Sequence, residues 1–151
     1  MNQNQTPIIM GCDHAAYRLK EKLKSLLTEK GIPVEDVGTF NENSVDYPEF
    51  GIKVAARVSA GNYQRGILIC GTGLGMSMVA NKFPHVRAAL CNDLFSAEMS
   101  RRHNDANILV MGGRVIGDVL ASAIVEKWLE TPFEGGRHQQ RLDKFDRIDN
   151  M

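Results

Sequence analysis

The pattern of apolar and polar positions divides the chain into two kinds of segment that alternate. Short continuous apolar runs, typical of buried strands in parallel sheets, cover residues 7–12, 32–37, 66–70, 86–91 and 107–111. Segments with apolar residues at helical spacing follow them over residues 15–30, 48–60, 74–82, 94–102 and 117–129. Five strands that alternate with five helices predict an α/β fold, in which helices cover both faces of a mainly parallel five-stranded sheet.

The first predicted helix is amphipathic and illustrates the pattern. Leu19, Leu23 and Leu27 fall on one face, which we expect to pack on the sheet. Lys20 and Lys24 fall on the other face and are expected to lie in water. Gly31 then ends the helix.

The two ends of the chain differ from this alternating region. Residues 1–6 form a polar tail, and residues 135–151 are rich in Arg, Gln, Asp and Lys. The C-terminal stretch also predicts an additional helix with a narrow apolar stripe formed by Leu142, Phe145 and Ile148. Such a stripe either docks on a partner subunit or packs back on its own domain. No linker or repeat divides the chain, so we expect a single domain over residues 1–151.

Composition limits the classes of partner. The 18 basic and 18 acidic residues cancel, which disfavours general binding to nucleic acid or to an anionic membrane. No apolar segment approaches the roughly 18 residues of a membrane span, and no signal peptide is recognisable, so we expect a cytoplasmic protein. The three cysteines are too few and too widely spaced for a disulfide framework or a structural zinc site.

Reactive side chains follow several of the predicted strands. In open α/β sheets, ligands bind at the carboxyl ends of the strands, near a switch in strand order. The residues at these ends include Cys12, Asp13 and His14 after the first strand, Cys70 to Gly75 after the third, Cys91, Asn92 and Asp93 after the fourth, and Gly112 to Arg114 after the fifth. The fold class therefore predicts a binding site at this edge.

Cys70 stands out because the glycine-rich turn Gly71-Thr72-Gly73-Leu74-Gly75 follows it directly. Backbone N–H groups of such a turn, at a helix N-terminus, favour negative charge and can hold an oxyanion or a thiolate. Cys70 is then a candidate nucleophile or base, although a buried structural cysteine is the commoner case. Cys12 and Cys91 lack such a turn and are interpreted as structural.

The spacing of the glycines excludes two common phosphate loops. The pattern GxGxG lies on the third strand, whereas the dinucleotide fingerprint GxGxxG lies on the first and needs an acidic residue after the next strand. A P-loop would end in Gly-Lys-Ser/Thr, which is absent. A dedicated anion hole fits the sequence better.

Three further groups of residues are candidates for chemistry. Asp13 can cap a helix, but His14 in the first helical turn is harder to explain without an anionic ligand. His103 follows the fourth helix, whose dipole favours an imidazolium that could act as a general acid. Arg137 and Arg141 are four residues apart on one helical face, a spacing that suits a phosphate group or plain exposure to solvent.

Taken together, these residues resemble the type B ribose-5-phosphate isomerase family, which also contains galactose-6-phosphate and allose-6-phosphate isomerases. The resemblance covers residues 8 to about 147. The matching blocks are Gly11-Cys12-Asp13-His14, Asp46-Tyr47-Pro48, Gly66-Ile67-Leu68-Ile69-Cys70-Gly71-Thr72-Gly73, Ala80-Asn81-Lys82, Arg101-Arg102-His103-Asn104-Asp105, Gly113-Arg114-Val115 and Glu134-Gly135-Gly136-Arg137-His138.

The resemblance implies a Rossmann-like α/β/α sandwich and a homodimer, possibly a tetramer, with sites at the subunit interface. It implies interconversion of ribose 5-phosphate and ribulose 5-phosphate, a step of the pentose phosphate pathway, through a cis-enediolate without metal or cofactor. The implied catalytic residues are Cys70, His103, Asp13 and Thr72. The implied substrate-binding residues are His14, Gly71, Gly73, Leu74, Gly75, Asn104, Arg114, Arg137, His138 and Arg141.

Two points of the resemblance bear on mechanism and specificity. The family uses either this cysteine or a glutamate just past the glycine loop as base, and here the later position is Met76, which favours Cys70. A galactose- or allose-6-phosphate isomerase would use the same chemistry and remains an alternative. A non-catalytic phosphosugar- or nucleotide-binding module would leave Cys70 and His103 without a role, and a flavodoxin-like carrier would place its phosphate loop after the first strand.

Overall fold

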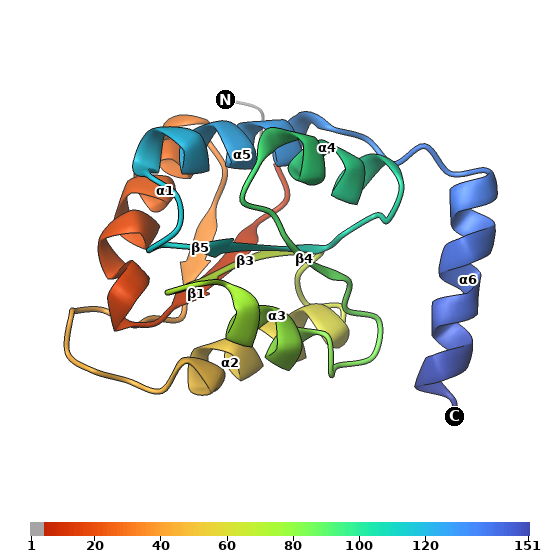
Figure 1. The fold of residues 1–151 in the computed structure, drawn as a ribbon, viewed down its shortest axis with the longest axis horizontal. Helices are drawn as coiled ribbons and strands as arrows, with labels where there is room; N and C mark the ends of the chain where they lie inside the picture. Colours follow the sequence, from red (N-terminus) through yellow and green to blue (C-terminus); the bar gives the residue numbers. More distant parts are fainter. Residues whose placement is uncertain (1–4) are drawn as a thin grey trace.

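The structure is a computed structural model that describes residues 5–151, so most of the predicted polar tail at 1–6 lies outside the described residues. Strands and helices alternate as the sequence predicts (Figure 1). The strands are β1 (Ile8–Cys12), β2 (Val34–Asp36), β3 (Arg65–Cys70), β4 (Ala88–Leu90) and β5 (Ile108–Gly112). The helices are the short η1 (His14–Ala16), α1 (Tyr17–Glu29), α2 (Tyr47–Ser59), α3 (Leu74–Ala80), α4 (Leu94–Arg102), α5 (Asp118–Glu130) and α6 (Arg137–Asp149).

The strands form one parallel sheet in the order β2-β1-β3-β5-β4. Helices α1, α4 and α5 cover one face of this sheet, and α2 and α3 cover the other (Figure 1). The predicted three-layer α/β/α sandwich is therefore confirmed. Because the chain moves outward from β1 to β2 and then returns to β3, the carboxyl ends of β1 and β3 flank a switch in strand order, where such folds bind ligands.

Each face of the sheet has its own apolar core, because strands covered on both sides bury successive residues in opposite directions. Helix α2 lies close to its face because Gly11 and Gly66 have no side chains. A Cβ at Gly66 would lie 2.9 Å from Val54 of α2, and a Cβ at Gly11 would lie 3.1 Å from it. These glycines therefore set the distance between α2 and strands β1 and β3.

The expectation that Lys20 faces water is wrong. Its side chain is fully buried, and its Nζ donates to Asp36 Oδ1 and to the carbonyl oxygen of Thr39, both at 2.6 Å. The ammonium group also lies 4.9 Å from the ring centre of Phe40. Helical spacing cannot reveal this burial, because the covering loop comes from residues that follow β2. Lys20 thereby anchors the start of the loop between β2 and α2.

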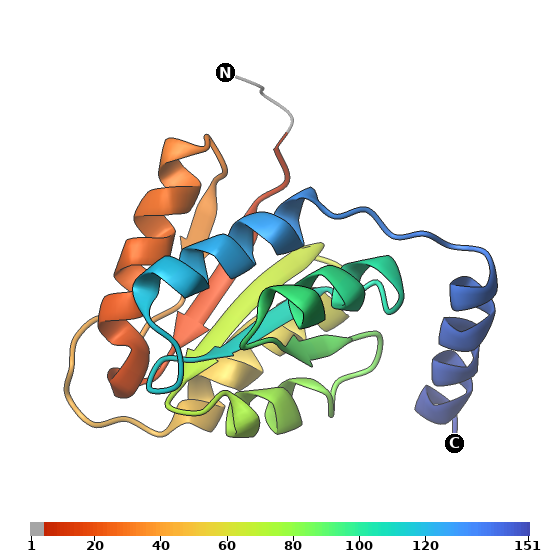
Figure 2. The ribbon, with the colours of Figure 1, turned by 45° about the horizontal axis from the view of Figure 1, so that its top comes forward.

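Helix α6 confirms the predicted C-terminal helix and stands apart from the helices that cover the sheet (Figures 1 and 2). Its apolar stripe is only partly covered within the chain. Leu142 is buried, whereas Phe145 and Ile148 are 46% and 66% exposed. No helix within residues 5–151 has the length and apolar character needed to cross a membrane.

Candidate active site

Cys70 ends β3 and contacts the turn that follows it. Its Sγ accepts a hydrogen bond from the Gly73 N–H at 3.2 Å, and its side chain is only 4% exposed. Gly73 has a φ of +82°, and a Cβ there would overlap Leu90 and lie 3.1 Å from the Met111 carbonyl. Only glycine fits this position. The turn therefore directs a backbone donor at the sulfur, as the sequence predicts.

Neighbouring elements hold the rest of the glycine turn in place. The Thr72 hydroxyl oxygen accepts the Leu74 N–H at 3.2 Å, and the Arg114 N–H donates to the Gly71 carbonyl at 2.9 Å. The Arg114 side chain lies beside Gly71, because a Cβ on that glycine would lie 3.5 Å from Arg114 Cδ. The structure thus places Arg114 beside the glycine turn.

Tyr47, at the start of α2, covers the far end of the turn. A Cβ on Gly75 would overlap the Tyr47 ring and hydroxyl group. The sequence placed Tyr47 in a block that resembles the family but gave it no role. Its proximity to Gly75 depends on the close packing of α2 on α3, which no local pattern reveals.

Asp13 and His14 follow β1 beside this turn. The Asp13 carboxylate accepts the Ala15 N–H at 3.1 Å, and the Asp13 N–H donates to the Ile69 carbonyl of β3 at 3.2 Å. Asp13 is therefore a helix cap held close to Cys70. His14 Nδ1 accepts the Val45 N–H at 3.1 Å, which leaves Nε2 as the ring nitrogen that can donate to a ligand.

Cys12 and Cys91 are the other two cysteines of the chain. All three cysteines are free and buried. Burial raises the pKa of Cys12 to about 12 and that of Cys91 to about 11. These thiols stay protonated near neutral pH, in agreement with the structural role predicted for them.

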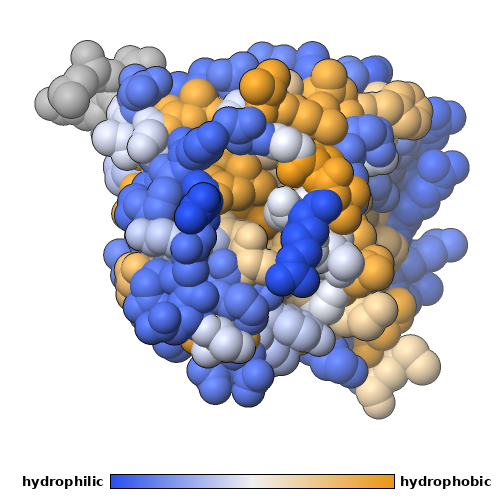
Figure 3. All heavy atoms as spheres, turned by 60° about the vertical axis from the view of Figure 1, so that its left-hand side comes forward, coloured by the Kyte–Doolittle hydropathy of each residue, from blue (hydrophilic) through white to orange (hydrophobic). Residues whose placement is uncertain are grey.

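Figure 3 looks at the edge of the sheet where these residues gather. This face is hollowed, with hydrophilic side chains along one margin and hydrophobic ones along another. Exposed apolar side chains also occur at the starts of α3, α4 and α5, and Leu74, Phe95 and Val119 are 52%, 71% and 81% exposed among the described residues. Because these helix starts follow the carboxyl ends of β3, β4 and β5, they form an exposed apolar rim at this edge of the sheet.

His103 lies in a second group, between α4 and α6. Its ring stacks on that of His138, with centres 4.3 Å apart and an angle of 10° between the planes. His138 Nε2 lies 3.4 Å from a Glu134 carboxylate oxygen, and Arg102 donates to the other oxygen. Burial lowers the pKa of His138, and the charges of His103 and Arg137 lower it further. The His138 ring thus supports one face of the His103 ring.

The remaining candidates Asn104, Arg137 and Arg141 belong to this second group and are exposed. Donor atoms of His103, Glu134 and His138 lie within 4.8 Å of one another, close enough for a divalent ion. Because Arg102 already pairs with Glu134 at 2.5 Å and Arg137 and Arg141 add positive charge, we assign no metal here.

The two groups lie at opposite ends of the strands, the first at the carboxyl edge of the sheet and the second at its amino edge. Cys70 is the last residue of β3 and pairs with Gly112, the last of β5, whereas His103 follows α4 and precedes β5. A β-strand rises about 3.3 Å per residue, so β3 alone separates its two ends by roughly 17 Å. The candidate residues of one chain therefore fall into two separate groups, or candidate half-sites: Asp13, His14, Cys70 to Gly75 and Arg114 in one, and His103, Asn104, Arg137, His138 and Arg141 in the other.

Comparisons with known proteins identify the family. The family model described as Ribose/Galactose Isomerase matches residues 8–145. The chain belongs to the ribose/galactose isomerase family. Ribose-5-phosphate isomerase B of Escherichia coli is 46% identical over 142 residues, which cover 94% of this chain and 95% of that protein.

Solved structures of ribose/galactose isomerases agree with this fold. The structure of Clostridium thermocellum ribose-5-phosphate isomerase B has a TM-score of 0.93 and 51% identity, covering 95% of this chain and 97% of that one. Mycoplasma genitalium ribose-5-phosphate isomerase B with bound ribulose 5-phosphate has a TM-score of 0.92 and 38% identity, covering 95% and 96%. The expected type B isomerase fold and the expectation of an aldose–ketose isomerase are confirmed.

Proposed function

We propose that this chain interconverts ribose 5-phosphate and ribulose 5-phosphate through a cis-enediolate, with Cys70 as the base. The observation that carries the proposal is the Gly73 N–H directed at Cys70 Sγ, because it places the thiol and an oxyanion cradle side by side. The names of the Escherichia coli and Clostridium thermocellum relatives support the choice of substrate. The reaction is a step of the pentose phosphate pathway.

The chemistry needs one base and one anion hole. The Cys70 thiolate removes the proton from C2 of the open-chain aldose, and the electron pair moves to form the enediol double bond and the charged oxygen at C1. Backbone N–H groups from Gly71 to Gly75, with the Thr72 hydroxyl, stabilise that oxygen. The thiol then returns the proton to C1, and the oxygen at C2 becomes the ketone as its proton moves to the oxygen at C1.

Met76 supports the cysteine variant of the mechanism. It occupies the position where other family members carry a glutamate, and its side chain is fully buried in the core between α2 and the sheet. A buried thioether can neither accept a proton nor reach the substrate. Cys70 is then the group beside the turn that can act as base.

The other residues divide between ring opening and binding. His103 acts as the acid that opens the furanose ring, together with Asp13. His14, through Nε2–H, and Arg114, Arg137, His138 and Arg141 bind the phosphate and orient the chain of the sugar. Leu74 lines the cradle, and Asn104 binds a sugar hydroxyl.

Because the two half-sites lie at opposite edges of one chain, we propose a homodimer in which Cys70 of one subunit meets His103 of the other. The exposed Phe145 and Ile148 on α6 and the exposed apolar rim at the carboxyl edge of the sheet would then be covered, which places residues 135–151 at the interface. We further propose that residues 1–151 form one domain. Assembly into a tetramer and the cytoplasmic location stay predictions.

The base assignment is tested by exchange of the C2 proton. The Cys70→Ala variant is expected to keep its fold and its affinity for phosphate but to lose activity by about 10²–10⁴-fold, along with exchange of C2 deuterium into water. Cys91→Ala is a matched control, because it also removes a buried thiol at a strand end and should retain activity. Substantial turnover by Cys70→Ala would reject the assignment.

Substrate choice is tested by initial rates on ribose 5-phosphate, allose 6-phosphate and galactose 6-phosphate. We expect the highest kcat/KM with ribose 5-phosphate. A higher value with either hexose phosphate would favour the alternative isomerase, whereas binding without turnover of all three would favour a phosphosugar-binding module.

A further inference from the structure

A cavity of about 580 Å³ lies at the amino edge of the sheet, opposite Cys70. It is lined by Arg65 at the start of β3, Arg87 just before β4, Arg101 near the end of α4, and Asp105. Three guanidinium groups thus face one carboxylate. With His85 neutral, this lining carries a formal excess of two positive charges.

Asp105 cannot balance these arginines. One of its oxygens accepts from Arg101 at 2.9 Å, and the other accepts from Arg87 at 3.4 Å. Both Asp105 oxygens therefore already accept hydrogen bonds from arginines other than Arg65. Arg65 makes its hydrogen bond to a neutral group, the Leu129 carbonyl, at 3.3 Å.

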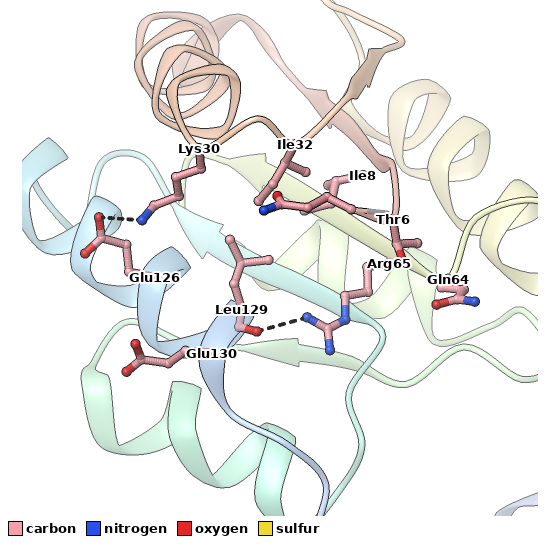
Figure 4. A pocket seen from close by; sticks show the side chains of 10 residues that line it. Thr6, Ile8, Lys30, Ile32, Gln64, Arg65, Glu126, Leu129 and Glu130 are labelled. Carbon is pink, nitrogen blue, oxygen red and sulfur yellow. Dashed lines mark hydrogen bonds and ion pairs between the residues drawn. The ribbon is translucent and has the colours of Figure 1, made fainter. Parts of the chain in front are cut away.

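Other nearby carboxylates do not pair with Arg65. Glu126 pairs with Lys30 at 3.4 Å, and Glu130 pairs with Lys127 at 3.1 Å. In Figure 4 both carboxylates point away from the Arg65 guanidinium, which reaches the Leu129 carbonyl. Burial lowers the pKa of Arg65, and the charge of Arg101 lowers it further. Charge at Arg65 is thus poorly compensated.

Helix C-termini also gather at this edge, and their carbonyl oxygens could offset positive charge. Most of these oxygens are already used by the turns that follow the helices. At the end of α2, Gly61 and Asn62 N–H groups bond to the Val58 and Arg57 carbonyls. At the end of α4, the Arg101 and Ser100 carbonyls accept from Asp105 and Ala106.

The guanidinium groups have unused donors. Each guanidinium offers five N–H bonds, yet Arg65 uses one of them within residues 5–151, to Leu129. The Arg101 side chain is only 7% exposed, and its Nε has no hydrogen-bond partner among the described residues. A multivalent oxyanion supplies both the missing charge and several acceptors in the geometry that guanidinium forks match.

We propose that this cavity binds a phosphate group, either free or carried by a small metabolite, at a site separate from the proposed catalytic one. The phosphate lies between Arg65 and Arg87, the more accessible arginines, with the buried Arg101 behind it. The cavity is larger than a phosphate ion alone requires, so an ester with a short polar chain also fits.

Trp128 offers a probe of this site, because it is the only tryptophan of the chain. Its ring centre lies 5.3 Å from the Arg65 guanidinium and 5.8 Å from that of Arg101. Anion binding at these arginines changes the charge beside the indole and hence its fluorescence. Cys70 is at the opposite edge of the sheet, whereas the His103 group lies at the same edge as this cavity, so a variant of Arg141 is needed to separate the two.

The test is a fluorescence titration with inorganic phosphate, and separately with glycerol 3-phosphate, against potassium chloride at matched ionic strength. We expect a saturable change with both phosphates and none with chloride. Tighter binding of glycerol 3-phosphate would indicate a metabolite, and equal binding would indicate free phosphate. A response that fails to saturate, or that chloride reproduces, would overturn the proposal.

Variants assign the response to the cavity. Arg65→Gln is expected to weaken phosphate binding by at least about tenfold, whereas Arg57→Gln, an exposed arginine on α2, leaves it unchanged. Arg65→Lys keeps the positive charge but lacks the paired N–H donors of a guanidinium, so we expect an intermediate affinity. This variant tests the site if Arg65→Gln does not fold. An unchanged affinity in both Arg65 variants, or a response abolished by Arg141→Gln on α6, would contradict this site.

Discussion

Cys70 and His103 lie at opposite edges of the parallel sheet within one chain. Cys70 ends β3 at the carboxyl edge, and His103 follows α4, which runs back to the amino edge before β5. No rearrangement of side chains can bridge that separation, because the rigid sheet lies between them. If both residues act in one reaction, two copies of the chain must provide them.

The glycine turn gives a prediction about stability. Gly73→Ala is expected to lower the free energy of unfolding by at least about 2 kcal/mol, because Gly73 has a positive φ and a Cβ there would overlap Leu90. Gly117→Ala is the control, since its Cβ would meet no atom within 4 Å, and it should cost no more than about 1 kcal/mol, because alanine then replaces glycine at the N-cap of α5. Urea denaturation measures both, and equal effects would mean that the turn tolerates a side chain.

Lys20 and Lys24 both pair with Asp36, so variants of the two lysines compare a buried ion pair with a partly exposed one. Both donate to Asp36, but the Lys20 side chain is fully buried and that of Lys24 is 35% exposed. Lys20→Met should cost about 3 kcal/mol, because it leaves a largely buried carboxylate without its main partner. Lys24→Met should cost less than about 1 kcal/mol. Denaturation midpoints that fall equally for the two variants would argue against a buried ion pair.

His138 predicts how stability depends on pH. Its pKa is lowered in the folded chain by burial and by the charges of His103 and Arg137, so below about pH 6.5 the unfolded chain binds a proton that the folded chain does not. Stability should therefore fall as the pH drops through this range. His138→Gln removes this contribution, and denaturation at about pH 7.5 and 5.5 measures it. The exposed His85→Gln should behave as wild type, and a wild-type slope in His138→Gln would refute the prediction.

The order of strands and helices could be predicted from the sequence because continuous apolar runs and helical spacing are local signals. The exact ends of the edge strands could not be predicted in this way. Residues 86–91 were expected to form a strand, but β4 covers only Ala88–Leu90, since an edge strand has one neighbour to pair with. Lys20 was misplaced because its burial depends on a loop that folds over it from β2.

The candidate site was predictable where it depends on strand ends. Asp13, Cys70 and Arg114 follow parallel strands that the fold class aligns, and the structure brings them together. The positions of Tyr47 over Gly75 and of Val45 on His14 depend on how α2 and its preceding loop pack, which periodicity does not encode. His103 lies apart from Cys70 because α4 runs back from the carboxyl edge of the sheet and ends at its amino edge.

We propose that one catalytic site combines Cys70 of one subunit with His103 of another. It can be tested with two inactive variants, Cys70→Ala and His103→Ala, first assayed separately and then refolded together. In a two-fold dimer, a mixed pair contains one site with both residues intact and one site with neither.

The most direct measurement is the isomerase activity of the co-refolded mixture, relative to wild-type protein at the same concentration. Random pairing makes half of the dimers mixed, so the account predicts recovery of about a quarter of the wild-type activity from two variants that are each inactive. A mixture that stays as inactive as its components would contradict the shared site.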